Sequence, residues 1–150
     1  MTRKTDFKFK KMQKILIFTI SFLFLSSCQQ KITSSDLVLL NGYWEIDEVT
    51  MPDGSSKDYE INQTVDFIKY ENGEGIRKKV APQLDGTYLV TNHQESFKII
   101  EEEDHLFLEY KTEYGTWREK LIHLCEDEFT VENDQKTIYT YKKQEAFSIK

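Results

Sequence analysis

The sequence has little of what catalytic and metal-binding proteins need. Its three histidines, His93, His105 and His123, are far apart, and none has the spacing typical of zinc sites, which need three or four converging ligands. No serine stands in a nucleophile elbow, and no glycine-rich loop leads into a helix that would bind phosphate. These absences predict a protein that is not an enzyme and that has no metal site and no cofactor.

Long apolar runs are also scarce. The extended run Ile15 to Leu25 has 11 residues, interrupted by Thr19 and Ser21. As a helix at about 1.5 Å per residue it spans roughly 16 Å, well short of the ~30 Å hydrocarbon core of a bilayer. A basic segment followed by such a run predicts a signal-peptide helix, which starts at Met1 or alternatively at Met12. The basic residues are Arg3, Lys4, Lys8, Lys10, Lys11 and Lys14.

Small residues and a cysteine close this segment, as Leu25-Ser26-Ser27-Cys28. The stretch resembles the lipobox of bacterial lipoproteins, which are lipidated on the cysteine sulfur, cleaved just before it and then acylated, for example with palmitate, on the new amino group. The resemblance implies a signal peptide of residues 1–27 and a lipidated tether of residues 28–36. An ordinary signal-peptidase site with a chance cysteine is the alternative.

Removal of residues 1–27 would make the chain strongly acidic. It leaves 14 Lys and Arg against 25 Asp and Glu, a net charge of −11. Such a surface repels phosphate backbones and anionic lipid headgroups, so we expect no nucleic-acid partner and a membrane attachment that depends on the N-terminal lipid.

The residues after the cysteine carry a weaker signal about location. In lipoproteins of this kind an aspartate there tends to accompany inner-membrane retention, and an acidic run tends to accompany surface export. Gln29, Gln30 and Lys31 match neither pattern. The resemblance therefore favours a bacterial cell-envelope location, at the periplasmic face of the outer membrane.

Cys125 is left without a partner inside the chain if Cys28 carries lipid. The fold must then stand without an intramolecular disulfide, although exported proteins often contain them. We interpret Cys125 as a half-buried residue at the end of a strand. An intermolecular disulfide or a reactive thiol is the alternative.

From Leu39 onward, apolar and polar residues alternate, and turn-forming residues interrupt the pattern every 7 to 12 residues. Asn72-Gly73 and Asp85-Gly86 are tight-turn pairs, and one helical turn is expected at Ser35 to Leu39. The pattern predicts strands at Trp44–Ile46, Val65–Phe67, Ile76–Val80, Tyr88–Thr91, Phe97–Glu101, Leu106–Thr112, Trp117–Leu124, Phe129–Glu132 and Lys136–Lys142.

Consecutive short strands joined by tight turns pair as an antiparallel meander, whose edges are removed when it closes. The sequence thus predicts an all-β, up-and-down barrel of eight to nine strands over residues 37–143, followed by a tail at 144–150. A two-sheet β-sandwich is the alternative. Within Trp117–Leu124 the alternation changes phase, so either both faces are covered or a bulge intervenes. Inward-facing candidates are Trp44, Ile46, Val65, Phe67, Phe97, Ile99, Leu106, Leu108, Tyr110, Trp117, Leu121, Phe129, Val131 and Ile138.

Gly42-Tyr43-Trp44, just after the short helical turn, resembles the Gly-x-Trp entry of the lipocalin family. Together with the lipobox and the meander, the chain looks like the small lipocalin-like lipoproteins of Gram-negative bacteria. The resemblance implies that Gly42 and Trp44 close the barrel floor beneath a basic side chain from the far end of the sheet. Lys142 or Lys143 would supply that side chain here.

The lipocalin resemblance also implies a function, namely that the barrel binds or carries one small hydrophobic or amphipathic molecule. This hypothesis predicts an internal cavity that opens at one end. Ligand-binding candidates are Phe67, Phe97, Leu108, Tyr110 and Trp117. The alternative is an envelope interaction or inhibitor protein whose barrel is filled by its own side chains. The protein partner in that case is unknown.

The lipobox generates a direct prediction. Cys28→Ala should release the protein from membranes, because two or more acyl chains at about 0.8 kcal/mol per buried methylene make the anchoring effectively permanent. Membrane fractionation after a high-salt wash measures the effect. A variant that still pellets with the membranes would refute the anchor.

Overall fold

The protein folds into a closed antiparallel barrel. The computed structural model describes residues 31–60 and 62–144, so the predicted signal peptide, Leu25, Ser26, Ser27 and Cys28 lie outside the described residues. The elements are the 3-10 helix η2 (Asp36–Leu40) and the strands β1 (Gly42–Thr50), β2 (Ser56–Asp58), β3 (Val65–Glu71), β4 (Glu74–Pro82), β5 (Tyr88–Glu102), β6 (His105–Thr112), β7 (Gly115–Leu124), β8 (Glu128–Asn133) and β9 (Ile138–Lys143). No helix among the described residues is long and apolar enough to cross a membrane.

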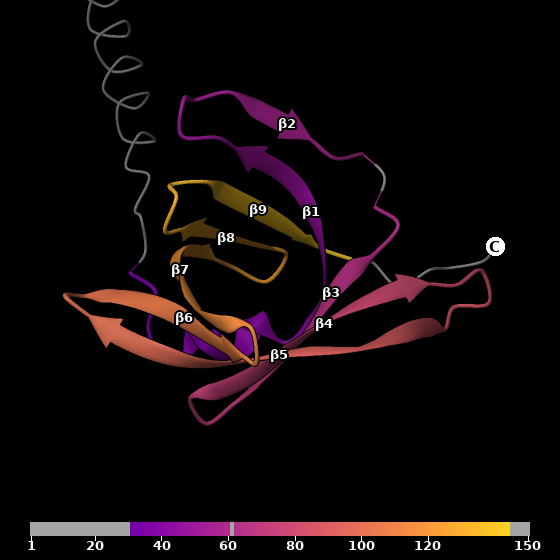
Figure 1. Ribbon diagram of the computed structural model, residues 1–150, viewed down its shortest axis with the longest axis horizontal. Coiled ribbons are helices and arrows are strands. Elements are labelled where there is room, and N and C mark those ends of the chain that lie inside the picture. Colours follow the sequence, from indigo (N-terminus) through magenta and orange to yellow (C-terminus); the bar gives the residue numbers. More distant parts are fainter. Residues whose placement is uncertain (1–30, 61, 145–150) are drawn as a thin grey trace, which may run out of the picture. The chain divides into compact units, whose positions relative to one another are not determined.

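Pairing of the first and last strands closes the sheet. Strand β1 pairs with β3 on one side and with β9 on the other. This pairing closes β1 and the run of strands from β3 through β9 into an eight-stranded ring (Figure 1). This confirms the predicted up-and-down barrel over the two-sheet sandwich. Strand β2 lies outside the ring and pairs with the end of β1. Its three residues are all exposed, so no alternation in the sequence marked it.

Turn chemistry agrees with the sequence at several places. Asn72 and Gly73 have φ of 51° and 88° between the paired residues Glu71 and Glu74, as a two-residue type I′ hairpin requires. The register of β7 with β8 shifts between Leu121 and His123, so of the two alternatives a bulge, at Ile122, accounts for the change of phase. The expected helical turn is present as η2.

Strand β5 corrects the prediction of two strands at Tyr88–Thr91 and Phe97–Glu101. It is one strand of 15 residues. Tyr88–Val90 pair with the end of β4, Gln94–Lys98 with the beginning of β4, and Ser96–Glu102 with β6. The register between β4 and β5 shifts between Lys78 and Val80. The β4–β5 hairpin extends away from the barrel (Figure 1), and Leu84, Leu89 and Val90 are exposed there.

The inward face of β3 is also different from the prediction. Ile68 belongs to the core cluster and Asp66 is 1% exposed, whereas Phe67 points the other way and packs against Tyr43 with ring centroids 5.0 Å apart. Val65 is buried but lies outside the core cluster. The error arose because three of the four residues from Val65 to Ile68 are apolar, so alternation alone did not fix the phase.

On β9 the expected inward residue was Ile138. Instead Tyr141 lies in the core cluster and Tyr139 packs against it. Because side chains alternate along a strand, Ile138 lies on the opposite face. The inward strip of β9 therefore consists of tyrosines, which bring hydroxyl groups into the barrel.

One end of the barrel is closed by η2 and Trp44. Leu37 and Leu40 of η2 are fully buried, and Trp44 Nε1 donates a 2.8 Å hydrogen bond to the Leu40 carbonyl. Lys143 Nζ lies 5.0 Å from the Trp44 ring. Gly42 has φ of +142°, and a Cβ there would come within 3.0 Å of Lys143 Cε. Lys143, not Lys142, therefore covers the indole, while Lys142 pairs with Asp47 at 2.8 Å.

Gly75 makes room for the Phe97 ring on the neighbouring strand, since a Cβ at this position would collide with that ring. We expect Gly75→Ala to lower the free energy of unfolding by about 1–3 kcal/mol, the usual cost of overpacking a core. Urea denaturation measures it. The double variant Gly75→Ala/Phe97→Leu should cost less than the sum of the single variants, and Ser96→Ala on the exposed face is the control. Additive costs would contradict the proposed collision.

Candidate functional site

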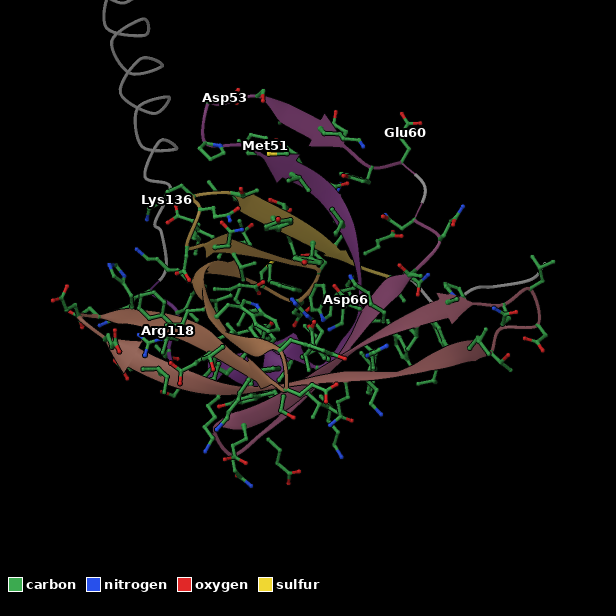
Figure 2. The ribbon with its side chains drawn as sticks, viewed as in Figure 1. Met51, Asp53, Glu60, Asp66, Arg118 and Lys136 are labelled. Atoms are coloured by element: carbon green, nitrogen blue, oxygen red, sulfur yellow. The ribbon has the colours of Figure 1, made fainter. Side chains whose placement is uncertain are left out.

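Charged side chains gather inside the barrel, where an apolar core is usual. They are Asp66 on β3, Arg77 and Lys79 on β4, Glu95 on β5 and Glu119 on β7, which we call the interior ionic cluster. Asp66 pairs with Lys79, and Arg77 with Glu95, directly across neighbouring strands. Asp66 lies two residues before the core residue Ile68 on β3, and Glu119 lies two residues before Leu121 on β7, so both share the inward face of their strands. Figure 2 labels Asp66 on β3.

Arg77 stands at the centre of this cluster. Its Nε donates a 2.8 Å hydrogen bond to Glu95, and its Nη1 donates one of 3.3 Å to Glu119. Its guanidinium lies 4.5 Å from the centroid of the Tyr110 ring, a cation–π distance. The Arg77 side chain is 13% exposed and that of Glu119 10%. The Arg77–Glu119 ion pair therefore forms largely out of contact with water, whereas the Glu95 side chain is 36% exposed.

Asp66 has an incomplete set of partners. Lys79 Nζ lies 2.7 Å from its Oδ1, yet among the described residues neither carboxylate oxygen has a hydrogen bond of ordinary geometry. The buried Tyr110 hydroxyl, close to Glu119, also lacks such a bond. Buried polar atoms in native proteins nearly always have a partner. These atoms can therefore accept a partner from outside the chain.

The interior ionic cluster extends from the solvent-exposed surface to the buried core. The Lys79 side chain is 51% exposed, whereas the carboxylate that it reaches is 1% exposed. Glu95 is likewise the more exposed partner of Arg77. A molecule that approached beside Lys79 would meet buried acceptors behind it.

Burial sets the protonation of the neighbouring groups. It raises the pKa of Glu119 above the ordinary value, although the Arg77 charge opposes the shift. Burial also raises the pKa of Tyr110 and Tyr141 well above 10, so both phenols are neutral at physiological pH. Neutral phenols can both donate and accept hydrogen bonds inside the barrel.

Aromatic rings pack beside the cluster. Tyr110 stacks on Trp117 with centroids 5.0 Å apart, and Phe97 lies 5.3 Å from Tyr110. The structure thus brings Phe97, Tyr110 and Trp117 together, with Leu108 in the same core cluster. Phe67, the fifth predicted ligand-binding residue, lies on the other face of the sheet. Their role in ligand binding stays a prediction.

The sequence analysis missed Asp66, Arg77 and Glu119. One signal was present, because Glu119 stands between Trp117 and Leu121, both of which the alternation placed inward. A carboxylate in phase with core residues is therefore a sign of a buried polar site. A rule that places every charged side chain in solvent does not detect such a carboxylate.

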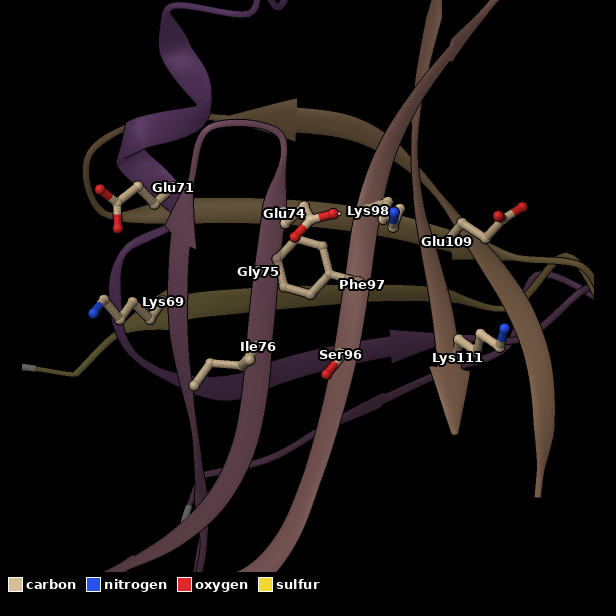
Figure 3. A pocket seen from close by; sticks show the side chains of 10 residues that line it. All are labelled: Lys69, Glu71, Glu74, Gly75, Ile76, Ser96, Phe97, Lys98, Glu109 and Lys111. Carbon is tan, nitrogen blue, oxygen red and sulfur yellow. Dashed lines mark ion pairs between the residues drawn. The ribbon is translucent and has the colours of Figure 1, made fainter. Parts of the chain in front are cut away.

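A groove of about 710 Å³ lies on the outer face of β3 to β6 (Figure 3). Its lining includes Lys69, Lys98 and Lys111 together with Glu71, Glu74 and Glu109. These residues alternate with core residues such as Ile68 and Phe97, so the groove is outside the barrel. Lys98 and Glu74 already form a 3.0 Å ion pair across it. The groove is thus a salt-bridged surface and differs from the internal cavity that the sequence analysis predicted.

Metal ligands do not converge in the part of the chain that the structure describes, where no group of three or more His, Cys, Asp or Glu residues could hold an ion. Cys125 is half-buried just after β7, as expected, and its Sγ lies 3.1 Å from Asp127 Oδ1.

An eight-stranded closed meander, entered through a 3-10 helix and Gly-x-Trp, is the arrangement that the resemblance implied. The domain has a lipocalin-like fold. No family model matches the chain, and no curated protein does.

Solved structures with similar folds include a lipocalin-like protein from Bacteroides uniformis, with 13% identity, a TM-score of 0.46, and 71% of this chain and 99% of that one covered. An uncharacterized protein from Bacteroides eggerthii has 13% identity and a TM-score of 0.45, with 70% and 99% covered. Apocrustacyanin C1 has 9% identity and a TM-score of 0.46, with 77% and 67% covered.

Glu119 should make stability depend on pH. Because its pKa is raised in the folded state, its contribution to stability is full below its ordinary value of 4.5 and is lost as the pH rises through the raised value. Glu119→Gln keeps an oxygen that can accept from Arg77 but cannot ionise. We therefore expect the stability of the wild type, relative to this variant, to fall as the pH rises through that range.

Urea denaturation across a pH series measures the difference, and Glu113→Gln in the exposed β6–β7 turn is the control. A constant difference between the wild type and Glu119→Gln would contradict the expectation.

Proposed function

We propose that this protein is a lipid-anchored binding protein of the bacterial cell envelope, whose barrel holds one small hydrophobic or amphipathic molecule. The observation that carries the proposal is the combination, inside a closed barrel, of stacked aromatic rings with buried polar atoms that lack partners. Aromatic walls with a few oriented polar groups are typical of sites that bind small molecules. Closed eight-stranded barrels are of a size that can hold one small ligand.

The N-terminal sequence supports the place of action. A lipobox-like segment would anchor the acidic domain through lipid, because its charge disfavours electrostatic attachment to anionic lipids. The barrel would then receive or deliver its ligand next to a bilayer. The lipocalin-like fold agrees with a binding role, and no catalytic group is needed for it.

Both tryptophans of the chain, Trp44 and Trp117, lie in the barrel wall, so intrinsic fluorescence reports directly on the interior. We expect saturable fluorescence changes when the full chain carrying Cys28→Ala, purified without detergent, is titrated with ten-carbon probes: decanol, decanoate and decylamine. Native mass spectrometry should detect a one-to-one complex with at least one of them.

Leu108→Trp should weaken binding of the probe that binds, because a larger side chain at a fully buried inward position fills space beside Tyr110. Ile122→Trp, at an exposed position of β7, is the matched control. The absence of saturable binding by all three probes would refute the proposal. It would favour the filled-barrel interaction protein, for which the exposed Leu84, Leu89 and Val90 of the β4–β5 hairpin are the first surface to test.

A further inference from the structure

The interior ionic cluster holds more negative than positive groups. Asp66, Glu95 and Glu119 contribute three carboxylates, while Arg77 and Lys79 contribute two cations. Arg77 pairs with two of the carboxylates, which leaves Asp66 to Lys79. Buried charges are costly unless they are paired and hydrogen-bonded. The buried carboxylate of Asp66 is therefore the group of the cluster that lacks hydrogen-bond donors among the described residues.

Lys79 neutralises Asp66 in an unusual way. Half of the lysine side chain is in solvent, yet its ammonium reaches a carboxylate that is 1% exposed. A partly exposed lysine gains little from an ion pair, because it gives up hydration and conformational freedom to hold the geometry. The ammonium of a ligand that also carries an apolar chain can therefore compete with Lys79 for the Asp66 carboxylate.

We propose that the barrel selects amphipathic molecules with a protonated primary amine, whose ammonium replaces that of Lys79 at Asp66. The inference rests on the proposed function and names the ligand class. The ammonium would donate to Oδ1 and Oδ2 of Asp66, neither of which has a hydrogen bond of ordinary geometry in the described part of the chain, and the Tyr110 hydroxyl is a further acceptor. The apolar chain would pack along the aromatic wall formed by Phe97, Tyr110 and Trp117.

The same geometry disfavours an acidic headgroup. A carboxylate ligand would stand among three carboxylates, and the Arg77 guanidinium, the group that would attract it, already donates to Glu95 and Glu119. A neutral alcohol would donate only one hydrogen bond and would bring no charge. The expected order of affinity is therefore amine, then alcohol, then carboxylate.

Isothermal titration calorimetry at neutral pH with decylamine, decanol and decanoate tests this order in the full chain carrying Cys28→Ala. Asp66→Asn should weaken decylamine binding by about tenfold or more, the range for loss of a charge-assisted hydrogen bond. Decanol binding should change much less. Lys79→Gln should strengthen decylamine binding by roughly two- to fivefold, since it removes a competing ion pair of the partly exposed kind.

Matched controls lie on the outer face. Asp47→Asn also removes a carboxylate from a 2.8 Å lysine pair, and Lys78→Gln also removes a lysine, from the position before Lys79. Neither should change the affinity for decylamine. Thermal denaturation of each variant establishes that it is folded. If Asp66→Asn does not fold, the Lys79→Gln variant alone tests the inference. The Lys79 side chain is half exposed, so its replacement should not prevent folding.

Decanol or decanoate binding as tight as that of decylamine would overturn the inference, as would unchanged or weaker decylamine binding in Lys79→Gln. In those cases the barrel would still be a binding protein. The absence of binding by all three probes would instead refute the proposed function itself.

Discussion

The guanidinium of Arg77, buried among carboxylates and over the face of Tyr110, is the interaction on which the barrel interior depends. A lone buried charge is strongly unfavourable, so Arg77 needs Glu95 and Glu119 beside it. Those partners come from β5 and β7, with β6 and its Tyr110 between them. The network thus links four consecutive strands through their side chains, in addition to the backbone hydrogen bonds of the sheet. It also prevents the interior from packing as a purely apolar core.

The closed floor and the interior ionic cluster are neighbours with different chemistry. In the floor, η2, Trp44 and Lys143 place a cation over an indole. Trp44 pairs directly with Asp66 across β1 and β3, so the cluster begins beside the floor. Its most exposed member is Lys79, whose side chain is half in solvent. The floor therefore contributes fully buried apolar side chains, and the cluster contributes charge and contact with solvent.

The features that the sequence revealed were those with a strong local cause. Positive φ at Asn72 and Gly73 and the change of phase at Ile122 each follow from residues next to one another in the chain. The Trp44 floor followed from a short motif. Asp66 and Glu119 could not be placed in this way, because alternation rules send carboxylates to solvent. Their charged partners are Lys79 for Asp66 and Arg77 for Glu119, and the positions of these partners depend on how the strands pair. The continuous β5 was missed for a related reason, since its extent depends on pairing with both β4 and β6.

Strand β2 has a consequence for how the domain behaves when crowded. Closure leaves the ring without unpaired strands, so β2 presents the free edge of the described sheet. Its residues Ser56, Lys57 and Asp58 are few, polar and fully exposed. Short, charged edges are poor templates for the addition of a strand from another molecule. Many copies held side by side on one surface would therefore resist edge-to-edge aggregation and remain separate barrels.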